Sequence, residues 1–516
     1  MIRRSRTATP SHWTAVVVLL ACVVAATCGG CKGVAAVTCP GDRLTFPRTP
    51  LKVTPEGRFY DVNSNGKADF AILHDPSGRL DILAYDDGED GHFDRTYRLS
   101  DYDALRVPHL IVMMDSLPHR VVAPRYAAGD WQWFYPPQKM ISPFPSMSIT
   151  TFNEILGGPP LGGLTEHHYD REKRQFRNRT IEQVYGYRFG WHRRTDFVVP
   201  YWTVGMMYLN PRPWYAWELA RAKRAFDESH NKVSVVYVGG SSGMISRLGQ
   251  QGAVEALDQI EQLCMQVLYE RRGAVKITIL SDHGHNFALS TNTLVGDTLR
   301  QAGYKVRTHD LRELNDVAIE ADGLVTCFGV HTRRPADVAE LLLEKRTEIE
   351  LALYQKGEQV IIRGRAGTAA IERRGERFRV VMVDGDVLRY EPAIGDLARR
   401  GKLDADGFAA DRDWLAATAD HEYPDVPRRV WDTFHGLAIN VPDVIFVLKD
   451  GYCAGSEFYA RMATMYSTHG GLNQVNSDGI VMTMVRPLDG PLRSRDVMPA
   501  IEPRYTPNLP PRVNEQ

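Results

Sequence analysis

Three short apolar runs do most to limit the fold that this chain can adopt. They are HLIVMMD (109–115), VSVVYVGG (233–240) and AVKITILSD (274–282), and each ends in Asp or Gly. Such runs are typical of strands that are buried on both faces, as in parallel sheets. Between the second and third runs, apolar residues recur with a helical period over 252–272. The sequence therefore predicts an α/β fold, with a mixed, mostly parallel sheet flanked by helices.

Length and charge narrow the class of protein further. At about 150 residues per domain, 516 residues suggest about three folding units. Lys and Arg number 62 against 63 Asp and Glu, so no overall field draws the protein to nucleic acid, and binding to a nucleic-acid duplex is not expected. With 43% hydrophobic and 24% charged residues, the composition is that of a globular protein.

The N-terminus carries an export pattern. Three arginines with no acid precede an uncharged apolar stretch at 13–27, which is typical of a secretion signal and short for a transmembrane helix. Cys28 or Cys31 resembles a bacterial lipoprotein processing site, whereas Cys22 fits that pattern better but lies too early in the apolar stretch. We predict an export segment over 1–38 and a periplasmic or cell-envelope location. A lipid anchor is the alternative to cleavage alone, and membrane contact is expected only through the signal peptide or that anchor.

Three cysteines remain in the rest of the chain, at positions 264, 327 and 453. Their number is odd and their spacing is long, so no disulfide framework is indicated. We expect buried free thiols.

Two acidic segments, 61–69 and 86–94, repeat one pattern 25 residues apart. Oxygen-bearing side chains at alternate positions and a glycine at the sixth position suit calcium. The candidate ligands are Asp61, Asn63, Asn65 and Asp69 in the first loop and Asp86, Asp90 and Asp94 in the second. The first loop is the favoured calcium site, because Gly88 occupies the third position of the second loop and offers no side-chain oxygen. Turns that join strands remain the alternative reading of this predicted small β-rich module over 40–104.

The ends of the predicted core strands carry the polar residues. Parallel sheets bind ligands at the carboxyl ends of their strands, so Asp115, the turn after Tyr237 and Asp282 should converge. Asp282 and His283 share a tight turn and could face one metal ion. The segment FPSMS (144–148) places hydroxyls before a helix, where an anionic phosphoryl group binds well. Taken singly, each of these features is also explained by a structural cap or turn.

Taken in order with STHGG (467–471), these segments resemble the alkaline phosphatase superfamily, most closely its type I phosphodiesterase/nucleotide pyrophosphatase branch. The similarity covers about 105–485. It implies that Ser148 is the nucleophile, with Ser146 as the alternative if the alignment shifts by two. It also implies one metal site made by Asp115, Ser148, Asp282 and His283, and places His469 in a second metal site.

The sequence departs from the family at that second site. The resemblance requires Asp and His after the middle strand, but Ser242 and Ser246 occupy those positions. Hydroxyls are poor substitutes, and a zinc site normally has at least three protein ligands, so His469 alone should not hold an ion. We expect one divalent ion, zinc or manganese. The residues after Ser148 lack the Pro and Arg of the sulfatase motif, which disfavours a sulfatase.

The region between the last two motifs is long and rich in strand patterns, notably over 357–392. We predict an inserted α+β cap subdomain at about 305–450 within a core of 105–485, and a Pro-rich tail over 486–516. Four arginines, Arg363, Arg365, Arg373 and Arg374, could meet an anionic substrate, but a solvated strand face is favoured. His167 and His168 could contact substrate, but a loop position without special chemistry is favoured.

The sequence thus predicts an exported, metal-dependent hydrolase that acts on small anionic phosphoesters, phosphodiester or phosphomonoester, or on phosphonates. The alternative is a non-catalytic or attenuated binding or scaffold protein on the same fold, because one metal half-site has lost its ligands.

Overall fold

The central sheet contains all three runs that the sequence predicts as strands. The computed structural model describes residues 43–178, 190–199, 204–462 and 464–505. The strand order is β11 (Val233–Val238), β6 (His109–Met114), β12 (Lys276–Ser281), β25 (Asp478–Thr483), β7 (Gln138–Ile141) and β26 (Leu492–Arg493). The first three strands are parallel, β25 is antiparallel to both neighbours, and β26 is parallel to β7. The predicted mixed α/β architecture is confirmed.

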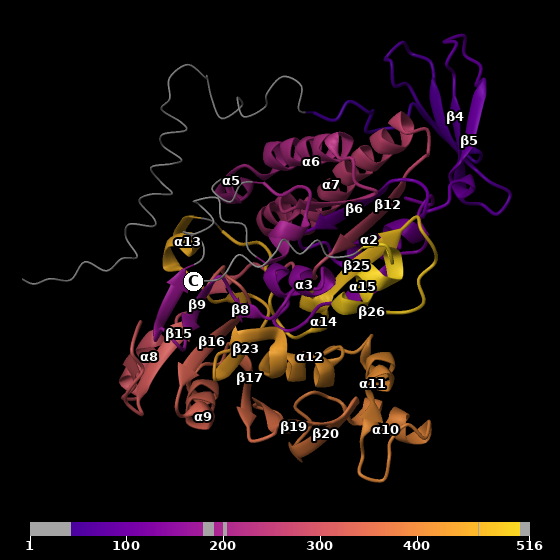
Figure 1. Cartoon of the computed structure of the whole chain (residues 1–516). Coiled ribbons are helices and arrows are strands. Elements are labelled where there is room, and N and C mark those ends of the chain that lie inside the picture. The colour runs from indigo at the N-terminus through magenta and orange to yellow at the C-terminus, as the bar shows by residue number, and fades with distance from the viewer. Residues whose placement is uncertain (1–42, 179–189, 200–203, 463, 506–516) are drawn as a thin grey trace, which may run out of the picture.

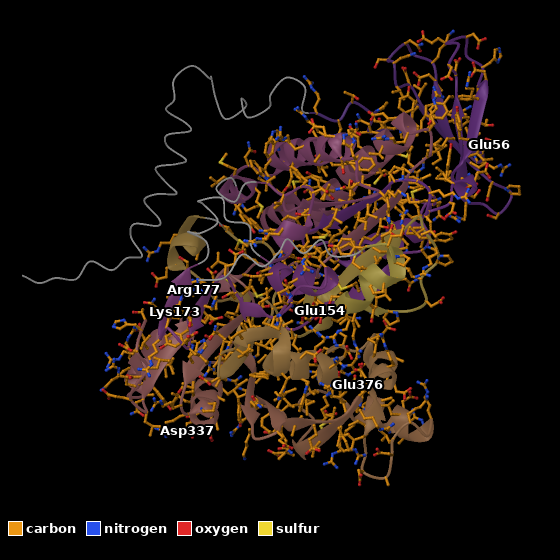
Figure 2. All side chains as sticks on the ribbon, in the orientation of Figure 1. Glu56, Glu154, Lys173, Arg177, Asp337 and Glu376 are labelled. Atoms are coloured by element: carbon orange, nitrogen blue, oxygen red, sulfur yellow. The ribbon has the colours of Figure 1, made fainter. Side chains whose placement is uncertain are left out.

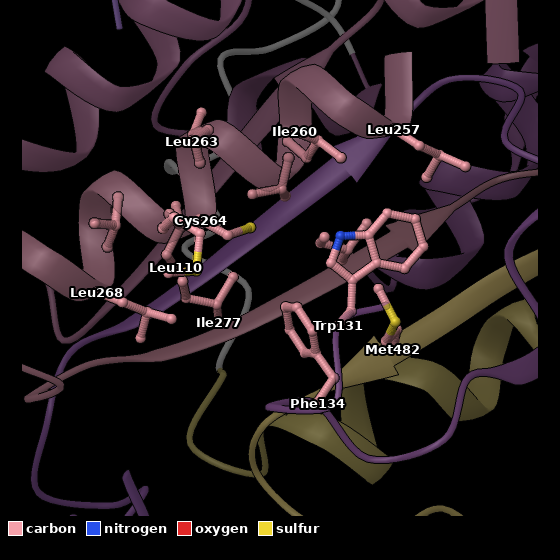
Figure 3. Packing of buried hydrophobic residues seen from close by; sticks show 14 of the residues in the cluster. Leu110, Trp131, Phe134, Leu257, Ile260, Leu263, Cys264, Leu268, Ile277 and Met482 are labelled. Carbon is pink, nitrogen blue, oxygen red and sulfur yellow. The ribbon is translucent and has the colours of Figure 1, made fainter. Parts of the chain in front are cut away.

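Helices cover both faces of this sheet (Figure 1). One face packs on α2 (His119–Ala127), α6 (Pro211–Glu228) and α7 (Gly240–Glu270), and the other on α3 (Ser148–Ile155), η3 (Gly190–Arg194) and α15 (Ser494–Ile501). Side chains alternate along a strand, so Leu110 joins the α7 core while Ile111 joins the α3 core. Figure 3 shows Leu110 and Ile277 packed beneath a stripe of α7. The labelled residues of that stripe are Leu257, Ile260, Leu263, Cys264 and Leu268.

An antiparallel five-stranded sheet precedes the core. Its strands are β1 (Lys52–Thr54), β2 (Gly57–Tyr60), β3 (Phe70–His74), β4 (Leu80–Tyr85) and β5 (Arg95–Arg98), followed by η2 (Leu99–Asp101). Phe70 and Tyr85 pack against Tyr269 at the end of α7, with ring centroids 5.2 and 5.6 Å away. The Tyr85 hydroxyl donates to the Tyr269 carbonyl at 3.0 Å. The sheet thus shares a buried aromatic cluster with the core.

A nine-stranded sheet fills the region drawn from salmon to orange in Figure 1. Its order is β14 (Lys305–Val306), β15 (Asp316–Glu320), β16 (Cys327–Thr332), β23 (Val444–Leu448), β17 (Ile349–Lys356), β18 (Gln359–Gly364), β19 (Gly367–Arg374), β20 (Arg377–Asp384) and β21 (Ala409–Ala410). The helices of this region are α8 (Gly296–Gln301), α9 (Pro335–Lys345), α10 (Glu391–Arg399), α11 (Asp411–Thr418), α12 (Val426–Asp432) and η5 (Thr433–Leu437).

The four arginines of this sheet bond to neighbouring groups of the same region. Arg363 contacts Glu340, Arg365 donates to the Ile349 carbonyl, Arg373 pairs with Glu376 and Arg374 pairs with Asp404. These contacts fit the strand-face role that the sequence favours.

The other elements are short strand pairs and short helices. They are β8 (Leu161–Gly163) with β22 (Ala438–Asn440), β9 (His167–Asp170) with β10 (Gln175–Asn178), β13 (Thr291–Asn292) with β24 (Tyr452–Cys453), and the helices α5 (Val204–Leu209), α13 (Glu457–Met462) and α14 (Gln474–Ser477). His167 and His168 therefore lie in a strand, because β10 pairs with them, and the prediction of a loop is wrong.

Glu154 links α3 to the last helix near the centre of the molecule (Figure 2). It accepts hydrogen bonds from Ser494 and, at 2.7 Å, from Arg495, and Arg495 also bonds to Asp432 of α12. The sequence predicts a Pro-rich tail over 486–516, but residues 492–501 within it form β26 and α15. The reason is that Val497, Met498 and Ile501 bury one helix face against the core.

The predicted export segment 1–38 and its cysteines lie outside the described residues. Within the described ranges, no helix combines the length and apolar character needed to cross a membrane. Cys264, Cys327 and Cys453 are buried and free in this part of the chain, as predicted.

Candidate metal and nucleophile site

Asp115, Asp282 and His283 converge at the carboxyl ends of β6 and β12. Their ligand atoms all lie within 4.8 Å of one another, and all three residues are buried. Ser148 joins them from the start of α3, with its Oγ 3.2 Å from Asp115 Oδ2 and 3.4 Å from His283 Nε2. The structure therefore brings together the four residues that the resemblance assigns to one metal site.

The local backbone explains this convergence. Ser281 is opposite Met114 in the parallel register, so both strands leave the sheet at the same edge. Ser116 adopts a left-handed conformation with φ of 72°, and its amide donates to Asp282 Oδ1 at 2.8 Å. Gly284 is required because a Cβ there would lie 2.3 Å from the Val475 carbonyl oxygen. The DHG motif is thus a turn that has no room for a side chain at its glycine.

The donor atoms suit a divalent cation. His283 Nδ1 lies 2.9 Å from the Gly284 carbonyl and must donate to it, which leaves a lone pair on Nε2. Burial lowers the pKa of His283, so the ring is neutral. Asp282 Oδ2 is buried without a hydrogen-bond partner in the described part of the chain. Burial and the nearby Asp115 raise the pKa of Asp282 well above its ordinary value, and a cation would relieve both effects. Two carboxylates, one imidazole and a hydroxyl fit zinc or manganese.

Ser148 is the first residue of α3. Met147 precedes it in extended conformation and caps the helix with no side-chain hydrogen bond. The first backbone amides of a helix have no partner within the helix and lie at its positive end. Thr151 fixes the start of the helix by donating to the Met147 carbonyl at 2.9 Å. The nucleophile candidate thus lies beside a favourable place for a phosphoryl group.

Ser146, the alternative nucleophile, has a different environment. Its side chain is fully buried, and its Oγ donates to the Gly471 carbonyl at 2.8 Å and accepts from Arg429 at 3.1 Å. These bonds hold the hydroxyl to the late THGG segment. Of the two serines, Ser148 is the one that contacts Asp115 and His283.

His469 lies next to the three-residue group but is not part of it. Its ring stacks on His283 with centroids 4.0 Å apart, and its Nδ1 donates to the Ser146 carbonyl at 3.0 Å. Burial and the neighbouring His283 lower the pKa of His469 to about 3. A neutral His469 therefore packs against the site.

Ser242 and Ser246 lie in the first turns of α7 and are buried, with 2% of each residue exposed. Beside them, Ser241 Oγ donates to the backbone carbonyl of Asp115 at 2.7 Å. Over the described residues, Asp115, Asp282 and His283 form the one group of three close metal ligands.

Two residues at this site were not singled out from the sequence. The Tyr237 hydroxyl donates to Asp115 Oδ2 at 2.7 Å, although only the turn after Tyr237 had been expected to matter. His285 is fully buried, with Nδ1 2.7 Å from Ser467 Oγ and with Nε2 lacking a partner among the described residues. A second histidine directly after the DHG motif was the available signal for His285.

The two acidic loops share one hydrogen-bond pattern. Asp61 accepts from the amides four and five residues later, and Asp86 does the same. In the second loop, the carboxylates of Asp86, Asp90 and Asp94 all approach Gly88 within 4.0 Å of where its Cβ would lie. These bonds are those of Asx-type turns, and calcium binding stays a prediction for both loops.

No family model matches the chain, and no curated protein matches it. A comparison with solved structures finds matches at 9% and 10% sequence identity.

Murine ectonucleotide pyrophosphatase / phosphodiesterase 5 (ENPP5, NPP5) has 9% identity and a TM-score of 0.41, with 75% of this chain and 92% of that chain covered. Phosphonoacetate hydrolase from Sinorhizobium meliloti 1021, in complex with phosphonoformate, has 10% identity and a TM-score of 0.38, with 81% and 97% covered.

Proposed function

We propose that this chain is an exported, metal-dependent hydrolase of phosphoester or phosphonate ester substrates, with Ser148 as its nucleophile. One observation carries the proposal: Ser148 Oγ lies 3.2 Å from Asp115 Oδ2 and 3.4 Å from His283 Nε2 at the N-terminus of α3. A hydroxyl placed between a carboxylate and an imidazole lone pair, at the positive end of a helix, suits attack on an anionic phosphorus centre. Export rests on the N-terminal sequence.

Asp115, Asp282, His283 and Ser148 would hold one zinc or manganese ion. When bound, such an ion supplies Lewis-acid stabilisation of negative charge. The chain's own residues carry the rest of the mechanism. Asp115 Oδ2 accepts the Ser148 proton as the Oγ–P bond forms and the ester P–O bond breaks, and water protonates the leaving alkoxide. The first amides of α3 donate to the phosphoryl oxygens. The hydroxide left from that water then attacks the phosphorus, the Oγ–P bond breaks, and Asp115 returns its proton to Ser148 Oγ, which restores the hydroxyl.

The test compares three nitrophenyl substrates, a phosphate monoester, a phosphodiester and a phosphonate ester, on metal-stripped protein with zinc or manganese added back. Ser148→Ala should lower turnover by about 1,000-fold or more while the metal remains bound. Ser146→Ala is the matched control and should retain turnover wherever circular dichroism shows that it is folded. Full activity in Ser148→Ala would refute the assignment of the nucleophile.

The second candidate is a binding or scaffold protein. Ser242 and Ser246 favour it, because neither can replace a carboxylate or imidazole ligand. It predicts at most one tightly bound zinc ion per chain and no turnover of any of the three substrates. In the first candidate, Ser242→Asp/Ser246→His should raise turnover. Elemental analysis that finds two zinc ions in the unaltered chain would contradict the loss of the second site.

A further inference from the structure

Tyr237 shares a carboxylate oxygen with the candidate nucleophile. Asp115 Oδ2 accepts one hydrogen bond from the Tyr237 hydroxyl at 2.7 Å and another from Ser148 Oγ at 3.2 Å. Two neutral donors therefore fix the same oxygen from different elements, β11 and α3. The contacts that fix the Tyr237 phenol therefore also fix Asp115 Oδ2, which accepts the Ser148 proton.

The Tyr237 ring is held by aromatic side chains. Phe152 meets it edge to face with centroids 5.4 Å apart, and Trp191 does the same at 4.8 Å. Phe152 follows Ser148 by one helical turn on α3, so both point from the same side of that helix. The ring that orients Asp115 thus packs directly on the helix that carries the nucleophile.

The turn after Tyr237 is closed by the protein's own groups. Glu218 accepts from the amides of Gly239 and Gly240 at 3.0 and 2.6 Å, and Ser241 Oγ bonds to the Asp115 carbonyl. On this side of Asp115, the groups that contact it are two hydrogen-bond donors, the hydroxyls of Tyr237 and Ser241. The described residues offer no second cluster of metal ligands here. A hydroxyl dipole provides the local positive charge beside this oxygen.

We propose that Tyr237 is a positioning residue for the hydrolysis: its hydroxyl fixes the Asp115 oxygen that takes the Ser148 proton, and it does so where the chain lacks ligands for a second cation. This inference rests on the proposed function. Tyr237 keeps its own proton throughout, because only the proton of Ser148 moves, to Asp115 Oδ2, as the Oγ–P bond forms. Residues that orient a metal ligand from outside typically change metal affinity or activity by about 10 to 100-fold when removed.

The test is Tyr237→Phe, which removes the hydroxyl and keeps the ring contacts with Phe152 and Trp191. We expect kcat to fall by about 10 to 100-fold with KM within about twofold. Zinc Kd, measured by competition with a chromophoric chelator, should rise by about tenfold.

Tyr215→Phe is the matched control, because it removes another buried hydroxyl, which donates to the Ala256 carbonyl at 3.1 Å and not to Asp115. It should leave kcat and zinc Kd unchanged. Equal losses in both variants, or unchanged kcat and zinc Kd in Tyr237→Phe, would overturn the proposal.

The two proposals fail differently. If Ser148→Ala is fully active, the proposed nucleophile is wrong, and zinc Kd still tests the Tyr237 contact. If Ser148→Ala is inactive and Tyr237→Phe matches the unaltered chain, only the Tyr237 role is wrong. Should Tyr237→Phe not fold, Trp191→Phe loosens the ring and keeps the hydroxyl. It should lower kcat at constant KM, and no change in kcat and zinc Kd would refute the role.

Discussion

Glu218 is a fully buried carboxylate beneath the N-terminus of α7, and its protonation should affect stability. Burial raises the pKa of Glu218 from 4.5 to about 8, although the amides of Gly239 and Gly240 oppose the shift. The unfolded chain releases this proton near pH 4.5, whereas the folded chain holds it until about pH 8. The free energy of unfolding therefore falls as the pH rises from 4.5 to about 8, because only the folded chain still holds the Glu218 proton. Above this range the loss of stability is constant.

We expect Glu218→Gln to remove that pH dependence. Between pH 4.5 and 8 the free energy of unfolding of the unaltered chain should fall relative to the variant by about 3–5 kcal/mol. Urea unfolding across this range measures the difference in slope. Glu255→Gln, at an exposed ion pair with Arg212, is the control and should change the slope little. Parallel curves for Glu218→Gln and the unaltered chain would contradict the argument.

The role of a single residue can be predicted from the sequence where its type and its neighbours in the chain define that role. Asp115, Ser148, Asp282 and His283 belong to short motifs, and the structure brings them together. Tyr237 and Glu218 could not be found in this way, because each depends on partners distant in sequence. Tyr237 lies 122 residues from Asp115, and nothing in the run VSVVYVGG marks its hydroxyl.

The acidic loops carry the candidate calcium ligands. In the second loop three carboxylates gather around Gly88, so charge repulsion among them would favour a bound cation. We expect millimolar calcium, but not magnesium, to raise the melting temperature by several degrees. Asp61→Ala and Asp90→Ala each remove one candidate ligand and separate the contributions of the two loops. If calcium leaves the melting temperature unchanged in every form, both loops are turns only.

Helices and strands could be predicted where their hydrophobic pattern is strong without help from tertiary contacts. The runs of β6, β11 and β12 and the long apolar stripe of α7 are such cases. The segment that forms β26 and α15 gave no clear signal, because it is short and carries Pro499 inside the helix. The apolar face of α15 is buried only because it packs against α3, and β26 forms only because it pairs with β7.

At the scale of the whole molecule, a buried ion cluster joins the central sheet to helices of the nine-stranded region. Arg493 of β26, 5% exposed, pairs at 2.6 Å with both Asp411 of α11 and Asp425 at the start of α12. Arg493→Met should lower the free energy of unfolding by about 3–5 kcal/mol, because it leaves Asp425 buried without a cation.

Adding Asp425→Asn to that variant should recover part of the loss, since the uncompensated charge is removed. Arg412→Met, which breaks a more exposed pair between α11 and α15, is the control and should cost about 1 kcal/mol or less. Urea unfolding of the four proteins measures these differences. Equal losses for the Arg493 and Arg412 variants would contradict the role of burial.

The strand order also sets when the nucleophile can be placed during synthesis. β7 ends at Ile141, just before the segment that leads to Ser148, yet its sheet neighbours β25 and β26 come from residues 478–493. A nascent chain on the ribosome cannot complete these pairings until almost all of it has emerged. Pairings of such long sequence separation also form slowly. Ser148 therefore reaches its acceptor late, which suits a chain that is predicted to cross a membrane before it folds.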